Sequence, residues 1–420
     1  MSVSVGSGSR TLLVVAASRD AVPIVSEVRR LGLRIVVCDG ASDAPALRVA
    51  DAGLVTPVDD PDAVVEAARA YGAQAAIDGV LAAGIEVPRT VAAVADALGL
   101  PGPPLTTAAV LADRLRVRHR LRDAGVAVPW SAVVPDVDAL RRLAGRRPGP
   151  VVVRPVERHA MGALRVDAHV DPAWAFAHAA FASPSGRVMV EDMVPGPQVA
   201  AHAVTVEGRT QLVSLGDRVL AAASRPFLVE EAVTWPSRQA GSLDEPVEAL
   251  VSTAATVLGL RNGVLRASIV VGTEGPVLIT LGTGLAGGAA CTHAVPLASG
   301  VDLLDAAVRC ACGDVPSISA AHAGGGRGVA CRTLFPPSGL VVEIRGFGDA
   351  AASEGIVSAD ALIETGMRVD LATTRRHAAG MIVAVGATAA AARARADAAA
   401  ARIRILTRAP LARVVVPTAP

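Results

Sequence analysis

Residues 275–288, GPVLITLGTGLAGG, read as a β-strand that runs into a glycine-rich turn. The surrounding residues 275–301 carry no formal charge, yet glycine, threonine, serine and proline interrupt them too often for a membrane span. The turn contains a G-x-G-x-x-G pattern, and Asp302 follows at the distance expected of a dinucleotide site. That site would need a helix and then a second strand, and Pro296 breaks this pattern. The stretch is therefore better explained as a strand and turn of another α/β fold.

The composition limits what the protein can bind. The chain has 420 residues, enough for two or three domains, with 19% charged residues and a formal net charge of +1. This balance argues against nucleic acid and against an anionic membrane as partners. The 40 basic residues are all arginine, because the sequence contains no lysine. Any phosphate site must therefore use the planar guanidinium group rather than an ammonium group.

The cysteines and the N-terminus indicate a reduced protein of the cytoplasm. The five cysteines are odd in number and lack metal-site spacing, so we interpret Cys310 and Cys312 as helix-packing residues. The first ten residues are polar and contain no apolar core of a signal peptide. No Ser–His–Asp or Cys–His arrangement can be argued from the spacing, so no catalytic residue is assigned.

Strand and helix patterns alternate along the chain, which predicts a parallel sheet covered by helices on both faces. The predicted strands lie at 11–16, 34–38, 75–77 and 130–134. The predicted helices lie at 22–31, 61–71, 88–98, 107–124 and 387–402. The segment LPGPPLT at 100–106 reads as a linker between domains.

The order of several motifs resembles that of the ATP-grasp family. Segments 112–134, 149–166 and 188–209 are similar to the family's Asp-Lys helix, Lys-Pro strand and hinge strand. The segment 376–388 is similar to the C-terminal lobe of the biotin-carboxylase-like and L-amino-acid-ligase branch. The resemblance implies an α/β ATP-grasp fold with an N-terminal Rossmann-like domain, a small lid and a C-terminal α+β body. We place these parts at residues 1–105, 106–200 and 201–328, with a C-terminal lobe at 329–420.

The resemblance also implies an ATP site. In the family the Asp-Lys helix and the Lys-Pro strand reach phosphates, the hinge backbone meets adenine, and a glutamate holds the ribose. The matching positions here are Arg114, Arg154, Glu191, Asp192, Met193, Val194 and Gln198. Arginine keeps the charge and Gln198 can still accept a hydrogen bond, although Arg154 could also be a surface arginine at a strand end. The loop at 157–162 is a poor phosphate cradle because only Gly162 provides a flexible backbone, and we interpret its His159 as solvated.

The metal positions depart from the family pattern. There the strand at 275–288 would end Glu-x-Asn-Pro-Arg-x-Gly-Gly, and a second glutamate precedes it. Ser268, Thr280 and Gly282 occupy the three ligand positions, while Arg266 replaces a histidine and Gly284 replaces the arginine. We also expect Glu274 to lie in a hairpin turn and Asp302 to cap a helix. Without these carboxylates, Mg²⁺ binding is expected to be weak or absent.

Two functions remain open at this point. The first is a degenerate ligase that binds ATP or a small metabolite, such as an amino acid or a carboxylate, or that partners an active enzyme. The second is an active carboxylate–amine ligase that forms an acyl phosphate and has rebuilt its metal ligands. In either case we expect a homodimer or a complex with a related enzyme.

Overall fold

The computed structural model describes residues 9–157, 163–285, 289–318 and 327–409. Its N-terminal domain is a parallel sheet with the strand order β3-β2-β1-β4. The elements are β1 (Thr11–Val15), α1 (Val22–Arg30), β2 (Arg34–Asp39), β3 (Ala52–Val55), α2 (Pro61–Gly72), β4 (Gly79–Ala82) and α3 (Pro88–Leu98). Alternate β1 residues point to opposite faces, where Leu12 packs with α1 and Leu13 packs with α2 and α3. The predicted Rossmann-like arrangement is confirmed.

Two of the predicted elements in the first third of the chain are wrong. The strand expected at 75–77 lies instead at Gly79–Ala82, because that is the segment that pairs in parallel with residues 12–15 of β1. The helix expected at 107–124 is two helices, α4 (Leu105–Leu111) and α5 (Arg114–Asp123). Asp113 separates them, since its carboxylate accepts from the Arg116 N–H and caps α5.

The lid is an antiparallel sheet with the strand order β5-β8-β6-β7, covered by α6 and α7. Its elements are β5 (Ser131–Val134), α6 (Val137–Ala144), β6 (Val151–Pro155), β7 (Leu164–Val166), α7 (Pro172–Ala182) and β8 (Val188–Asp192). A later segment of the chain fastens it to the body: Arg165 N–H donates to Pro226 O at 2.9 Å, and Leu228 N–H donates to Ala163 O at 3.0 Å. Phe227, which lies between those two residues, is buried in the lid core.

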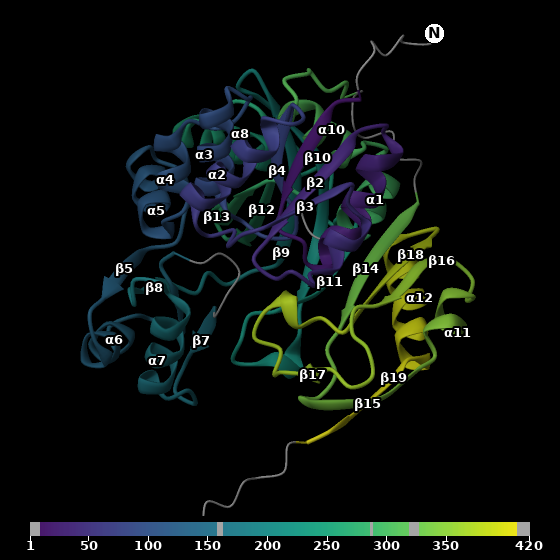
Figure 1. Ribbon diagram of the computed structural model, residues 1–420. Helices are drawn as coiled ribbons and strands as arrows, with labels where there is room; N and C mark the ends of the chain where they lie inside the picture. Colours follow the sequence, from purple (N-terminus) through teal and green to yellow (C-terminus); the bar gives the residue numbers. More distant parts are fainter. Residues whose placement is uncertain (1–8, 158–162, 286–288, 319–326, 410–420) are drawn as a thin grey trace, which may run out of the picture.

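The body and the C-terminal lobe share one eight-stranded sheet with the order β13-β12-β9-β10-β11-β14-β18-β16. The body elements are β9 (Gln198–Val206), β10 (Arg209–Leu220), β11 (Glu230–Trp235), α8 (Asp244–Leu258), β12 (Gly263–Gly272), β13 (Gly275–Thr283), α9 (Val295–Ser299) and α10 (Leu303–Ala311). One face of this sheet packs on α8, and the other faces α10 and the N-terminal domain. Figure 1 shows the lid and the lobe on either side below the N-terminal domain, with the sheet between them.

The C-terminal lobe adds three strands to the large sheet and carries a small sheet of its own, in the order β17-β15-β19. Its elements are β14 (Gly328–Leu334), β15 (Gly339–Arg345), α11 (Phe347–Ala351), β16 (Ile356–Ala361), β17 (Arg368–Val369), β18 (Gly380–Gly386), α12 (Ala389–Arg402) and β19 (Arg404–Arg408). Among the helices that the structure describes, none is both long and apolar enough to cross a bilayer. All five cysteines are free thiols, and Cys310 and Cys312 lie at the end of α10.

Candidate functional site

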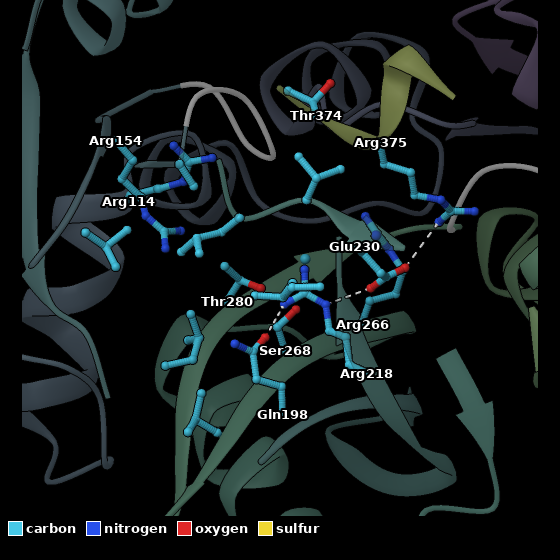
Figure 2. A pocket seen from close by; sticks show the side chains of 18 of the residues that line it. Arg114, Arg154, Gln198, Arg218, Glu230, Arg266, Ser268, Thr280, Thr374 and Arg375 are labelled. Carbon is cyan, nitrogen blue, oxygen red and sulfur yellow. Dashed lines mark hydrogen bonds and ion pairs between the residues drawn. The ribbon is translucent and has the colours of Figure 1, made fainter. Parts of the chain in front are cut away.

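A cleft of about 260 Å³ lies where the lid, the body, the loop after β4 and a turn of the C-terminal lobe meet. Figure 2 shows arginine side chains entering it from several elements. Every residue that the sequence predicted for the nucleotide lines this cleft: Arg114, Arg154, Glu191, Asp192, Met193, Val194 and Gln198. The three altered metal positions, Ser268, Thr280 and Gly282, line it as well. The structure thus brings all the predicted site residues together, while their ligand stays a prediction.

Strand register explains why the metal positions meet. In the antiparallel pair of β12 and β13, Arg266 lies opposite Gly282 and Ser268 lies opposite Thr280. Residues two apart on a strand face the same side, so all four positions lie on one face of the sheet. That face is the floor of the cleft, and it holds the positions to which the resemblance assigns the metal-binding carboxylates.

Glu191 is the centre of a buried ion-pair cluster beneath the hinge. Its side chain is 1% exposed and contacts Arg118 Nη2 at 2.9 Å and Arg154 Nη2 at 2.5 Å. Arg118 also donates to the carbonyl oxygens of Leu278 and Ile279, at 3.0 and 2.6 Å. Burial acts to raise the pKa of Glu191, but the charges of Arg154 and Arg118 outweigh it and hold that pKa below its ordinary value. Arg154 therefore shares the Glu191 carboxylate with Arg118, and its charge is partly compensated within the protein.

Arg114 differs from Arg154 in that no described carboxylate pairs with it. Its Nη1 donates to the Pro155 carbonyl oxygen at 2.6 Å, and no carboxylate of the described chain lies within ion-pair distance of it. Burial, followed by the charge of Arg154, lowers the pKa of Arg114 to about 9. The guanidinium therefore still carries its charge at neutral pH. Of the two predicted phosphate contacts, Arg114 is better placed electrostatically than Arg154.

Asp192 and its neighbours form the connection from the lid to β9. The Asp192 carboxylate accepts from Arg147 Nε at 2.6 Å, and the Arg147 guanidinium lies over the Trp130 ring at 4.4 Å. The Met193 N–H donates to the Pro150 carbonyl oxygen at 3.3 Å. The Asp192 side chain is thus held within the lid, which leaves backbone groups as the means by which this segment would contact a base.

A second polar cluster in the cleft was missed at the level of sequence. Gln198 Oε1 accepts from Arg218 Nη1 at 2.9 Å, and Arg218 Nε donates to Glu230 at 2.7 Å. Arg375, from the C-terminal lobe, lies 4.0 Å from Glu230. Arg218 is the register partner of Gln198 across β9 and β10, so strand pairing was the one signal that could have found it. The Gln198 Oε1 therefore already accepts a hydrogen bond within the protein, whereas a side chain that binds ribose would have its acceptor free.

A third cluster fills the altered metal position. Glu86, in the loop after β4, accepts from Arg266 Nη2 at 2.7 Å, although the two residues are 180 positions apart. A Cβ atom at Gly282 would collide with the Glu86 carboxylate. The space beside residue 282 is thus occupied by an ion pair that joins the N-terminal domain to the body.

The residue types at the three positions that the resemblance assigns to metal ligands do not suit Mg²⁺. Serine, threonine and glycine supply no carboxylate there, and the positive Arg266 lies among them. Within the described ranges, no group of three or more histidine, cysteine, aspartate or glutamate side chains could hold a metal ion. The loop at 158–162, with His159 and Gly162, and residues 286–288 of the glycine-rich turn lie outside the described residues.

The predictions for two nearby acidic residues are confirmed. Glu274 lies in the turn between β12 and β13, and Asp302 caps α10 by accepting from the N–H groups of Leu304 and Asp305, each at 3.0 Å. Because a helix follows Asp302, it is not the acidic end of a dinucleotide-binding strand. Gly284 has φ +87°, a conformation that disfavours the arginine found at this position in the family.

Comparison with known proteins agrees with this geometry. Residues 25–102 match the ATP-grasp N-terminal domain, and residues 332–408 match the L-amino acid ligase C-terminal domain 2. The crystal structure of an L-amino acid ligase from Bacillus licheniformis superposes with a TM-score of 0.78 and 19% identity, covering 95% of this chain and 99% of that one. The chain has the ATP-grasp fold.

Other ATP-grasp relatives extend the comparison. The biotin carboxylase domain of a Hydrogenobacter thermophilus 2-oxoglutarate carboxylase, solved with MgADP, ADP and bicarbonate, has a TM-score of 0.73 and 15% identity over 94% of this chain and 90% of that one. A formate-dependent phosphoribosylglycinamide formyltransferase from Synechococcus sp. strain CC9605 is 30% identical over 195 residues, 44% of this chain and 47% of that protein. The chain thus spans about half the length of the curated relatives it matches. The predicted fold and the ligase resemblance are both confirmed at this level.

Proposed function

We propose that this ATP-grasp protein is a degenerate carboxylate–amine ligase that binds a nucleotide or a small anionic metabolite without metal-dependent phosphoryl transfer. The observation that carries the proposal is the Glu86–Arg266 ion pair, which lies beside Gly282, a position that the resemblance assigns to a metal ligand. Phosphoryl transfer in this fold depends on Mg²⁺ to neutralise the charge that develops on the phosphates. A fixed guanidinium can attract phosphate, but it cannot coordinate the phosphates in the way a metal does.

In this proposal ATP lies between the lid and the body. The backbone around Met193 and Val194 would contact the adenine, and Gln198 with Arg218 would lie near the ribose. Arg114 would contact the phosphates, because charged donors bind phosphate oxygens strongly, and Arg266 would lie near them with its charge already shared with Glu86. The parts would be those that the sequence indicated, at 1–105, 106–200, 201–328 and 329–420.

The first test is ADP formation with and without Mg²⁺ over a panel of amino-acid pairs. We expect no Mg²⁺-dependent ADP. Robust Mg²⁺-dependent ADP release that is lost when cleft residues are mutated would refute the proposal of a degenerate ligase. Nucleotide affinity, measured by calorimetry, should change little with Mg²⁺, and a steep rise in affinity would point to unrecognised ligands.

The second test compares the contributions of Arg114 and Arg154 to ATP binding. Arg114→Ala should weaken ATP binding by about 1.5–3 kcal/mol, the value of a charge-assisted hydrogen bond. Arg154→Ala should also weaken it, but that variant leaves Glu191 with one fewer partner and must be compared for stability. Arg116→Ala is the matched control, because Arg116 lies on the same helix and is exposed. Equal affinity in Arg114→Ala and Arg116→Ala would remove Arg114 from the site.

The alternative is an active ligase with rebuilt metal ligands. It is favoured by one observation, which is that the carboxylates of Glu86 and Glu230 line the same cleft from different domains. In that case Mg²⁺-dependent ADP formation should occur and should be lost in both Glu86→Gln and Glu230→Gln. Activity that survives both changes would rule these two groups out as ligands.

We also propose that the chain acts as a homodimer or in a complex with a related enzyme. A degenerate ligase has no reaction of its own through which to act, so a surface offers the simplest role. Light scattering over a dilution series, together with purification from the native host, tests this. A dilution-independent monomer without a co-purifying protein would favour a simple metabolite-binding role instead.

A further inference from the structure

A second cavity, of about 270 Å³, lies between the N-terminal domain and the body. It is lined by β4, the start of α3, the linker before α4, the α8–β12 turn and α10, whose labels lie in the upper part of Figure 1. Its walls are mainly apolar and include Val80, Leu81, Val91, Val264, Ala307 and Ala311. A volume near the lower end of the range for small-molecule sites, with apolar walls, suits a compact apolar ligand.

The charged groups around this cavity favour an anion at its mouth. Arg261, in the α8–β12 turn, is the only basic residue among the described residues that line it. Arg261 is exposed and forms no ion pair with a described carboxylate. Glu86 also lines the cavity, but its carboxylate is already paired with Arg266. The Asn262 Oδ1 is occupied too, since it accepts from the Glu207 N–H at 2.8 Å.

We propose that this cavity is a second binding site, for a small amphipathic carboxylate whose apolar chain packs against the walls and whose carboxylate meets Arg261. A nucleotide does not suit it, because the walls offer few polar groups to a base, ribose or phosphates. An amine does not suit it either, since Glu86, which alone among the described lining residues has a carboxylate, is neutralised by Arg266. The inference does not depend on whether the cleft binds ATP.

Straight-chain carboxylates are the probes for the first experiment, with binding measured by calorimetry. From hexanoate to octanoate, affinity should rise about fourfold for each added methylene and then level off when the cavity is full. Octan-1-ol, which has the same apolar chain but no carboxylate, should also bind, through that chain alone. Arg261→Ala should weaken octanoate about two- to fivefold and leave octanol unchanged, because the contact is exposed to solvent. Arg404→Ala, an exposed arginine of the distant β19, is the control and should change neither.

Cys310 gives a second and independent readout, because it lines the cavity while Cys312 does not. In a Cys312→Ala variant, octanoate should slow alkylation of the remaining Cys310 at least fivefold, whereas Cys312 in a Cys310→Ala variant should react at an unchanged rate. Ala307→Leu, which reduces the cavity volume, should abolish binding while circular dichroism stays native.

Three results would overturn the proposal. These are an unchanged Cys310 alkylation rate at saturating octanoate, full octanoate affinity in a folded Ala307→Leu variant, and equal loss of octanoate and octanol binding in Arg261→Ala. If Ala307→Leu fails to fold, the alkylation and Arg261 measurements still decide the question.

Discussion

Replacing Glu191 by glutamine removes one negative charge from between two buried guanidinium groups. The carboxylate is 1% exposed, and the Arg118 and Arg154 side chains are 6% and 8% exposed, so water cannot compensate for its loss. Removing one partner from a buried ion pair typically costs about 3–5 kcal/mol, and the amide retains part of the hydrogen bonding. We therefore expect a loss of about 3 kcal/mol. Because Arg118 also bonds Leu278 and Ile279, the loss should loosen the lid against the body.

Asp192→Asn is the matched control, one residue along the same strand. Its carboxylate also pairs with an arginine, but the two side chains are about 30% exposed, and such pairs are worth about 0–1 kcal/mol. Urea unfolding followed by tryptophan fluorescence should show a midpoint lower by about 1 M for Glu191→Gln, if the urea slope is near 3 kcal/mol/M. Hydrogen exchange should rise in β8, α5 and β13. Equal midpoints for the two variants would refute the argument that burial determines the effect.

Three further outcomes follow from the described contacts. Gly282→Ala should displace the Glu86 carboxylate and cost about 1 kcal/mol, and the cost should vanish in a Glu86→Ala background, which a double-mutant cycle measures. Burial and the nearby positive charge lower the pKa of His202 to about 4, so folding resists its protonation. The free energy of unfolding therefore falls as the pH drops below about 6.5, by about 3 kcal/mol at pH 4. His202→Gln should flatten that part of the plot of urea midpoint against pH. Asp302→Ala should cost about 1 kcal/mol by removing the α10 cap, against less than about 0.5 kcal/mol for Asp305→Ala, which removes only a partly exposed ion pair with Arg309, as thermal unfolding can check.

Much of the architecture could be predicted because it depends on local patterns. Apolar runs and their spacing located β1, β2, α2 and α3, and the acidic residues at 274 and 302 were assigned from turn and cap chemistry alone. The strand at Gly79–Ala82 was misplaced because glycine and alanine give a weak strand signal, and tertiary pairing with β1 decided its position. The break at Asp113 was missed because neither glycine nor proline marks it, and a single capping aspartate is a weak signal within a helical segment.

The composition of the cleft could be predicted only in part. Motif order brought the predicted nucleotide residues into one place, because each motif lies at the end of a strand or at the start of a helix that borders the cleft. The partners of these residues could not be predicted. Glu86 and Arg266 come from different domains, and whether Arg154 is free or balanced depends on a carboxylate 37 positions away that the sequence assigned to the hinge. Charge compensation is a property of the folded chain, so residue types alone do not reveal it.

The attachment of residues 226–228 to β7 has a consequence for how the protein folds. An open strand edge can recruit a strand from another molecule, and here one edge of the lid sheet is covered by backbone from the body. The same contact means that the lid core lacks the Phe227 ring until translation has passed well beyond β8. A fragment that ends near residue 200 would carry a cavity in place of that ring, which typically costs about 3–5 kcal/mol. During synthesis the lid core should therefore stay incompletely packed until the β10–β11 connection has emerged from the ribosome. We expect chaperones to bind the lid until then.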